Sequence, residues 1–144
     1  MRAILALCLT LIATTSAAET LRIATFNASL SRSGPGLLVR DLDAGDDAQI
    51  LAVAEIIRTV RPDILLINEF DFDRSALAAT RFQALLAKPG TGTDGITYPH
   101  SFATPPNTGR ASGQDLNADG ELGGPNDAYG FGRFPGQYLS LIHI

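Results

Sequence analysis

The chain has 144 residues, with 11 basic side chains, 15 acidic side chains, two histidines and one cysteine. A chain of this length forms one domain around one hydrophobic core. The acidic balance argues against a broad nucleic-acid-binding surface built from basic residues, but it is compatible with a metal-assisted enzyme that acts on phosphates.

Residues 1–18 have the pattern of a secretory signal peptide. Arg2 supplies a positive start, residues 3–13 are almost wholly apolar, and Ser16-Ala17-Ala18 offers the small residues of a cleavage site. The apolar stretch is too short to span a membrane. Cys8 lies inside the stretch rather than at its end, which argues against lipidation. We expect a cleaved, soluble monomer that is secreted or periplasmic and has no membrane segment.

Removal of these 18 residues leaves 126, with ten basic and fifteen acidic side chains and no cysteine. An exported protein without cysteine has no disulfide bonds, so its stability depends on a hydrophobic core or on bound ions. The resulting net charge of −5 disfavours long nucleic acids as partners.

The first elements of the mature chain follow from composition and spacing. The apolar, β-favouring residues 20–26 predict a strand. Residues 31–47, rich in glycine and aspartate, predict a loop. Apolar residues at helical spacing predict a helix over residues 50–60, which Asp46-Asp47 caps and Pro62 ends.

Residues 64–67 are continuously apolar, which predicts a buried strand covered on both faces. The order strand, helix, strand favours a parallel pair joined by a right-handed crossover. A second helix is expected over residues 74–86, ended by Pro89-Gly90. These elements together predict an α/β domain.

The composition changes after the second predicted helix. Residues 90–136 contain eleven glycines and five prolines, which is typical of active-site loops or disorder. Residues 139–144 are an apolar tail without a turn signal or a polar end. They form either a strand or a spurious tail after an interrupted reading frame, and we favour the second interpretation.

Each predicted strand ends at a polar residue, Asn27 after the first and Glu69 after the second. In an open α/β sheet the carboxyl ends of the strands form the ligand-binding crevice, and amide and carboxylate oxygens suit a hard divalent cation. Asn68, Asp71 and Asp73 add oxygen ligands nearby. For Glu69, a metal-binding role and a solvated position are about equally supported. Asn27 alone is more typical of a turn.

Asp115, Asn117 and Asp119, followed by Gly120, have the spacing of the first half of a calcium-binding loop. The complete motif places a glutamate where this chain has Asn126. The segment therefore predicts either a calcium-stabilised loop or a plain acidic turn.

The remaining chemical signals are weak. His100 is more typical of a structural hydrogen-bonding residue, and His143 lies in the apolar tail. Arg110 and Arg133 are candidate phosphate contacts, although exposed arginines are common. The sequence has no P-loop, no zinc-ligand spacing and no serine or cysteine nucleophile paired with a base.

A family resemblance rests on two motifs, Leu21-Arg22-Ile23-Ala24-Thr25-Phe26-Asn27 and the segment 61–71, which contains Ile64-Leu65-Leu66-Ile67-Asn68-Glu69. Together they resemble the start of the endonuclease/exonuclease/phosphatase superfamily, the DNase-I-like phosphoesterases. Residues 98–102, 106–109 and 124–138 resemble an exported bacterial branch of it. The resemblance implies a four-layer α/β sandwich, of which residues 19–138 would form the amino-terminal half.

The resemblance also implies hydrolysis of a phosphoester by in-line attack of water, with Mg²⁺ or another divalent cation as cofactor. Glu69 matches the metal-binding glutamate of the family. Asn27 matches the asparagine that positions the metal or the scissile phosphate. The family's general-base histidine, its aspartate partner and its Asp-x-Asn pair lie further downstream and have no match here. We therefore expect an incomplete fragment with at most trace activity and marginal folding, because one inner sheet face would be bare.

Two other interpretations are open. One is a non-enzymatic exported module that binds Ca²⁺ through residues 115–120 and presents the glycine-rich segment for recognition. The other is a remnant without function. For the enzyme, DNA, RNA, a lipid head group and a small phosphate ester all fit as substrates, although the charge does not point to nucleic acid.

Overall fold

The computed structural model describes residues 19–143, and the predicted signal peptide lies outside them. None of the helices in this range has the length and apolarity that a membrane span requires. The predicted α/β class is confirmed. In chain order the elements are β1 (Ile23–Leu30), α1 (Leu37–Ala44), α2 (Ala48–Val60), β2 (Ile64–Phe70), α3 (Leu77–Leu86), β3 (Ser101–Phe102), the 3₁₀ turn η1 (Pro125–Asp127) and β4 (Leu139–His143).

The strands form one mixed sheet in the order β1-β2-β4-β3. β1 and β2 are parallel, as predicted, whereas β4 is antiparallel to both β2 and β3. Residues 139–143, which we interpreted as a spurious tail, are strand β4 in the interior of this sheet. They form a strand because their backbone groups pair on both sides, with β2 and with β3, which satisfies the backbone donors and acceptors.

Helix α1 occupies part of residues 31–47, which we predicted as a loop. Gly36 and Gly45 flank it with φ of 77° and 73°, a left-handed conformation that glycine adopts without steric cost. Little in the sequence indicates this helix, because glycine and aspartate dominate its segment and Leu38 is its only fully buried residue. Val39 and Leu42 are partly buried against the core, so the apolar face of this helix spans only about one turn.

Helices α2 and α3 follow the sequence prediction more closely. The Asp47 carboxylate caps α2 by accepting a hydrogen bond from the N–H of Ile50 at 2.8 Å. Helix α3 begins three residues later than predicted, at Leu77. The Asp73 carboxylate accepts the N–H of Leu77 at 2.9 Å and thereby defines the start of the helix.

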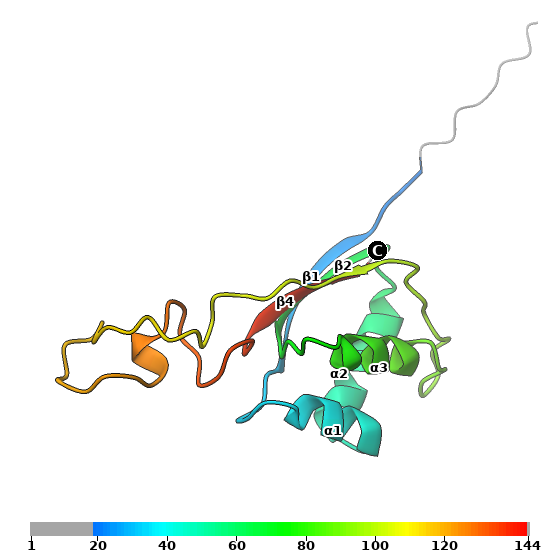
Figure 1. Ribbon diagram of the computed structural model, residues 1–144. Coiled ribbons are helices and arrows are strands. Elements are labelled where there is room, and N and C mark those ends of the chain that lie inside the picture. The colour runs from blue at the N-terminus through cyan, green and yellow to red at the C-terminus, as the bar shows by residue number, and fades with distance from the viewer. Residues whose placement is uncertain (1–18, 144) are drawn as a thin grey trace, which may run out of the picture.

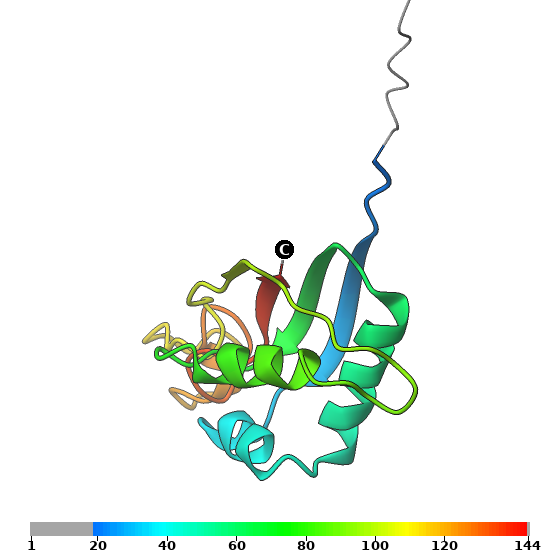
Figure 2. The same ribbon diagram turned by 90° about the vertical axis from the view of Figure 1, so that its right-hand side faces the viewer.

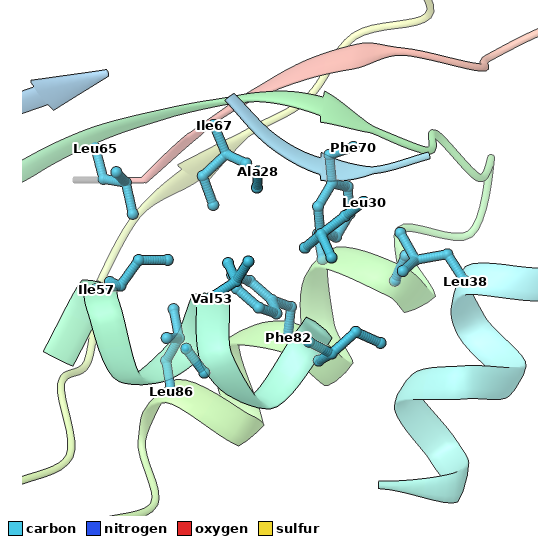
Figure 3. Packing of buried hydrophobic residues seen from close by; sticks show 14 of the residues in the cluster. Ala28, Leu30, Leu38, Val53, Ile57, Leu65, Ile67, Phe70, Phe82 and Leu86 are labelled. Atoms are coloured by element: carbon cyan, nitrogen blue, oxygen red, sulfur yellow. The ribbon is translucent and has the colours of Figure 1, made fainter. Parts of the chain in front are cut away.

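The hydrophobic core lies between the helices and one face of the sheet. All three helices lie on the same side of the sheet in Figure 1, and α3 crosses in front of the strands in Figure 2. Side chains from β1 and β2 point toward those of the helices (Figure 3). The residues labelled there are Ala28, Leu30, Leu38, Val53, Ile57, Leu65, Ile67, Phe70, Phe82 and Leu86, all buried.

The opposite face of the sheet carries no helix of the described residues. Thr25, Leu66, Ile142 and Phe102 lie side by side across it, because each pairs with the next in the register of the strands. Phe102 is 62% exposed and Ile23, on the same face, is 70% exposed. The cover expected on both faces of β2 is therefore present on one face within residues 19–143.

Candidate metal site

Asn27 and Glu69, the two residues singled out at the strand ends, are in contact. The Nδ2 of Asn27 donates a hydrogen bond to the Oε1 of Glu69 at 2.8 Å. The contact forms because β1 and β2 are parallel neighbours, with Asn27 opposite Asn68 in the register. Two polar side chains 42 residues apart are thus placed at the same edge of the sheet.

An irregularity in the sheet keeps the Glu69 carboxylate out of the core. Regular alternation would place Glu69 on the same face as Ile67, which the helices cover. The register of β2 instead shifts against both neighbouring strands at this point, and Glu69 has a φ of 58°. A bulge of this kind changes the direction in which a side chain points. A positive φ at a non-glycine residue is a strained conformation, and such residues cluster at functional sites.

Hydrogen bonds fix the orientation of the Asn27 side chain. Its Oδ1 accepts the N–H of Ser29 at 3.1 Å. Since a backbone N–H can only donate, the amide nitrogen of Asn27 must face Glu69. Asn27 therefore acts as a turn residue and also holds Glu69 in place. The second carboxylate oxygen of Glu69, Oε2, receives no hydrogen bond from the described residues.

The three other oxygen-bearing residues near Glu69 are engaged elsewhere. Asn68 bonds across the open face of the sheet, to Thr25 and Ser140. The Asp71 carboxylate is buried and accepts the N–H of Arg32 at 2.7 Å, and Asp73 caps α3. The dense ligand cluster that we expected is absent from residues 19–143, where no three acidic, histidine or cysteine side chains are grouped to hold a metal.

One oriented carboxylate with a free oxygen is a donor that a divalent cation can use. In proteins Mg²⁺ keeps several water ligands and binds through one or two carboxylates together with substrate phosphates, whereas Ca²⁺ takes more oxygen ligands from the protein. Glu69 offers one such carboxylate oxygen, its Oε2. Its contact with Asn27 holds the carboxylate in one orientation.

The sequence model described as the endonuclease/exonuclease/phosphatase family matches residues 24–138, which include both Asn27 and Glu69. The chain belongs to this family. No curated protein and no solved structure matches it. Endonuclease/exonuclease/phosphatase proteins are in general hydrolases of phosphoester bonds that depend on divalent metals. The mixed sheet with helices on one face is a partial DNase-I-like fold.

Neither histidine of this endonuclease/exonuclease/phosphatase chain is placed as a base beside Glu69. His143 pairs with Leu65, four positions before Glu69 on β2, which separates them by about 13 Å along the strand. His143, which the sequence analysis placed in the apolar tail, is held in the sheet by strand β4. It is fully buried, and its ring centroid lies 5.4 Å from that of Tyr98. His100 is exposed.

We expect His143 to make folding sensitive to acid. Neither of its buried ring nitrogens has a hydrogen-bond partner, and burial lowers its pKa from 6.5 to about 4. Between these pH values the unfolded state binds more protons than the folded state, so the free energy of unfolding falls as the pH drops. A tenfold difference in proton affinity is worth about 1.4 kcal/mol, so His143 should contribute a loss of about 2 kcal/mol between pH 7 and pH 5.

Urea unfolding of the wild type and of His143→Leu at both pH values checks this prediction. The difference between the two proteins isolates His143. The comparison is needed because burial raises the pKa of the Asp71 carboxyl to about 6. In both proteins this carboxyl makes the free energy of unfolding rise as the pH drops, which is opposite to the effect of His143. Equal pH dependence in the two proteins would contradict the prediction.

The predicted calcium loop is closed by its own hydrogen bonds. The Asp115 carboxylate accepts the N–H groups of Asp119 at 3.2 Å and Gly120 at 2.9 Å. The Nδ2 of Asn117 donates to the Oδ2 of Asp119 at 2.7 Å. These bonds account for the turn without a cation. Calcium binding by Asp115, Asn117 and Asp119 stays a prediction.

Two residues that the sequence analysis did not single out hold the chain that leaves β1. Arg32 forms ion pairs with Asp41 at 2.8 Å and with Asp47 at 3.3 Å. The buried Gln137 donates through its Nε2 to the backbone oxygen of Arg32 at 2.8 Å. The surplus of aspartates over residues 41–47 was the only sequence signal that a cation must lie nearby.

Proposed function

We propose that this protein is a divalent-metal-dependent phosphoesterase in which Glu69 binds Mg²⁺. The observation that carries the proposal is the contact between Asn27 and Glu69, formed where a bulge turns the carboxylate away from the core. A cation bound there would polarise a phosphoryl oxygen and offset charge on the leaving group. Membership of the family supports the reaction class.

The two residues have different tasks in this proposal. Glu69 binds the cation through Oε2, while its Oε1 is held by Asn27. Asn27 is a positioning residue for Glu69. Its Nδ2 carries a second hydrogen, which can donate to a phosphate oxygen of the substrate. When a cation is bound, the Asn27 amide and the cation at the same strand ends would together orient the substrate.

Because neither His100 nor His143 is placed as a base, we expect only trace activity from the 144-residue chain. Loss of a general base typically lowers the rate ~10²–10⁴-fold. Hydrolysis at the full rate of the family would contradict this part of the proposal.

The trace activity itself tests the role of Glu69. We expect slow, Mg²⁺-dependent hydrolysis of bis(4-nitrophenyl) phosphate that EDTA abolishes. Glu69→Gln should lose it, whereas Glu121→Gln, which alters an exposed glutamate in the glycine-rich segment, should retain it. Unchanged hydrolysis by Glu69→Gln, purified in the same way, would rule out the proposed site.

We also propose that the protein is exported and works as a monomer. The support is the signal-peptide pattern of residues 1–18 together with the absence of cysteine from the rest of the chain.

A further inference from the structure

A cavity of about 370 Å³ lies just beyond the carboxyl end of β2. This volume is within the range of small-molecule sites. Figure 1 shows the glycine-rich segment, in yellow and orange, projecting beyond the sheet at the end where β4 begins. The cavity is formed where this segment returns to the residues after β2. Its lining includes Phe72, Arg74, Pro105, Pro106, Arg110 and Pro135.

Backbone hydrogen bonds join the walls of this cavity. The N–H of Phe72 donates to the oxygen of Gly136 at 2.8 Å, and the N–H of Gly136 donates to the oxygen of Thr108 at 3.2 Å. Gly136 has a φ of 99°, and a Cβ there would lie 2.9 Å from the oxygen of Phe72. Only glycine therefore permits this junction, and the three segments that bear the lining residues are held together.

The charge in the cavity is positive and uncompensated. Arg74 and Arg110 are exposed and belong to no ion pair or side-chain hydrogen bond of residues 19–143, and the lining has no carboxylate. The Asp73 carboxylate beside Arg74 is occupied by three backbone N–H groups. The arginines that do form ion pairs within this range are Arg32, Arg40, Arg58 and Arg81.

The other side chains that line the cavity are apolar and contain rings. Phe72 is half-buried, and three prolines face the same space. Aromatic side chains stack on flat rings of any identity, and guanidinium groups bind phosphate through paired N–H donors. Phe72 follows Glu69 by three residues, which limits the distance between their Cα atoms to about 11 Å.

We propose that this cavity binds a phosphate joined to a flat aromatic group, as in a nucleoside monophosphate. Arg74 and Arg110 bind the phosphate, and Phe72 and the prolines contact the ring. The inference rests on the proposed function only in placing this ligand beside Glu69 as part of the substrate. Binding in the cavity requires no metal.

The test is calorimetric titration of AMP, ribose 5-phosphate and adenosine into the protein in EDTA. AMP should bind more tightly than either of the other two, which each lack one half of the recognised group. Arg74→Gln and Arg110→Gln should each weaken AMP binding about 10- to 100-fold, as expected for a lost charged contact. Arg133→Gln, which removes an exposed arginine outside the lining, should leave it unchanged.

A second variant separates ring recognition from phosphate recognition. Phe72→Leu should weaken the binding of AMP about tenfold and leave that of ribose 5-phosphate unchanged. Thermal unfolding confirms that each variant is folded. The inference is overturned if AMP does not bind at millimolar concentration, if AMP and ribose 5-phosphate bind equally, or if Arg133→Gln is as harmful as Arg110→Gln.

The same titration distinguishes this inference from the proposed function. Glu69→Gln should bind AMP as the wild type does, because its carboxylate is not part of the cavity lining. Failure of AMP binding together with EDTA-sensitive hydrolysis would remove the cavity proposal alone. AMP binding together with hydrolysis that ignores Glu69→Gln would remove the metal site alone.

Discussion

Replacing Arg58 with alanine is expected to lower the free energy of unfolding by about 3 kcal/mol. The Arg58 side chain is 4% exposed. Its guanidinium donates to the backbone oxygens of Leu85 at 2.6 Å and Leu86 at 3.4 Å. These are carbonyls at the carboxyl end of α3, which have no partner inside the helix, and a positive charge is favourable there. Each carbonyl also accepts a backbone N–H, Leu85 from Lys88 at 3.2 Å and Leu86 from Ile96 at 2.9 Å. The expected loss therefore comes from the charged hydrogen bonds that alanine removes and from the cavity that it opens.

Urea unfolding of Arg58→Ala beside Arg81→Ala measures this effect. Arg81 is a matched control, because it also forms an ion pair, with Asp43 at 2.6 Å, but its side chain is 46% exposed. An exposed pair contributes at most about 1 kcal/mol. Equal losses of stability in the two variants would show that Arg58 does not hold the end of α3.

Asn27→Asp is expected to make the stability of the protein depend on Mg²⁺. The substitution would place a second carboxylate at the contact that now joins Asn27 to Glu69 at 2.8 Å. Two carboxylates this close cannot both stay ionised without a cation. Their repulsion is worth about 1–4 kcal/mol at the effective dielectric constants of a protein surface. We expect a loss on the order of 2 kcal/mol in EDTA and its recovery in Mg²⁺.

Thermal unfolding in EDTA and in Mg²⁺ checks this result, with Asn27→Ala as the control. The alanine variant removes the hydrogen bond to Glu69 without adding charge, so its smaller loss should respond less to Mg²⁺. If Mg²⁺ fails to restore Asn27→Asp, the cation does not bind between these two side chains.

The sequence predicted the elements whose pattern is local. Periodic apolar residues located α2 and α3, and a continuous apolar run located β2. The parallel pairing of β1 with β2 followed from the short helical link. Helix α1 was missed because its apolar face, formed by Leu38, Val39 and Leu42, is short and lies in a segment rich in glycine and aspartate. Strand β4 stayed one of two interpretations of its segment because its partners, β2 and β3, are distant in the chain. A short apolar run gives no sign of what it pairs with.

Only part of the candidate site could be predicted from the sequence. Two strand ends in a parallel pair must meet, so the proximity of Asn27 and Glu69 followed from topology. The positions of Asp71 and Asp73 could not be predicted in this way. The Asp71 carboxylate accepts the N–H of Arg32, and the Asp73 carboxylate caps the start of α3. The cavity lined by Arg74 and Arg110 is formed by three segments that are distant in the chain, so no local sequence pattern predicts it.

Titration of Mg²⁺ into the protein by calorimetry tests the central claim most directly. We expect a single site in the wild type and in Glu121→Gln, and none in Glu69→Gln. Ca²⁺ titrated into Asp115→Ala shows in parallel whether the acidic loop binds a cation of its own. Undiminished Mg²⁺ binding by Glu69→Gln would contradict the account, because the cation would then be held elsewhere.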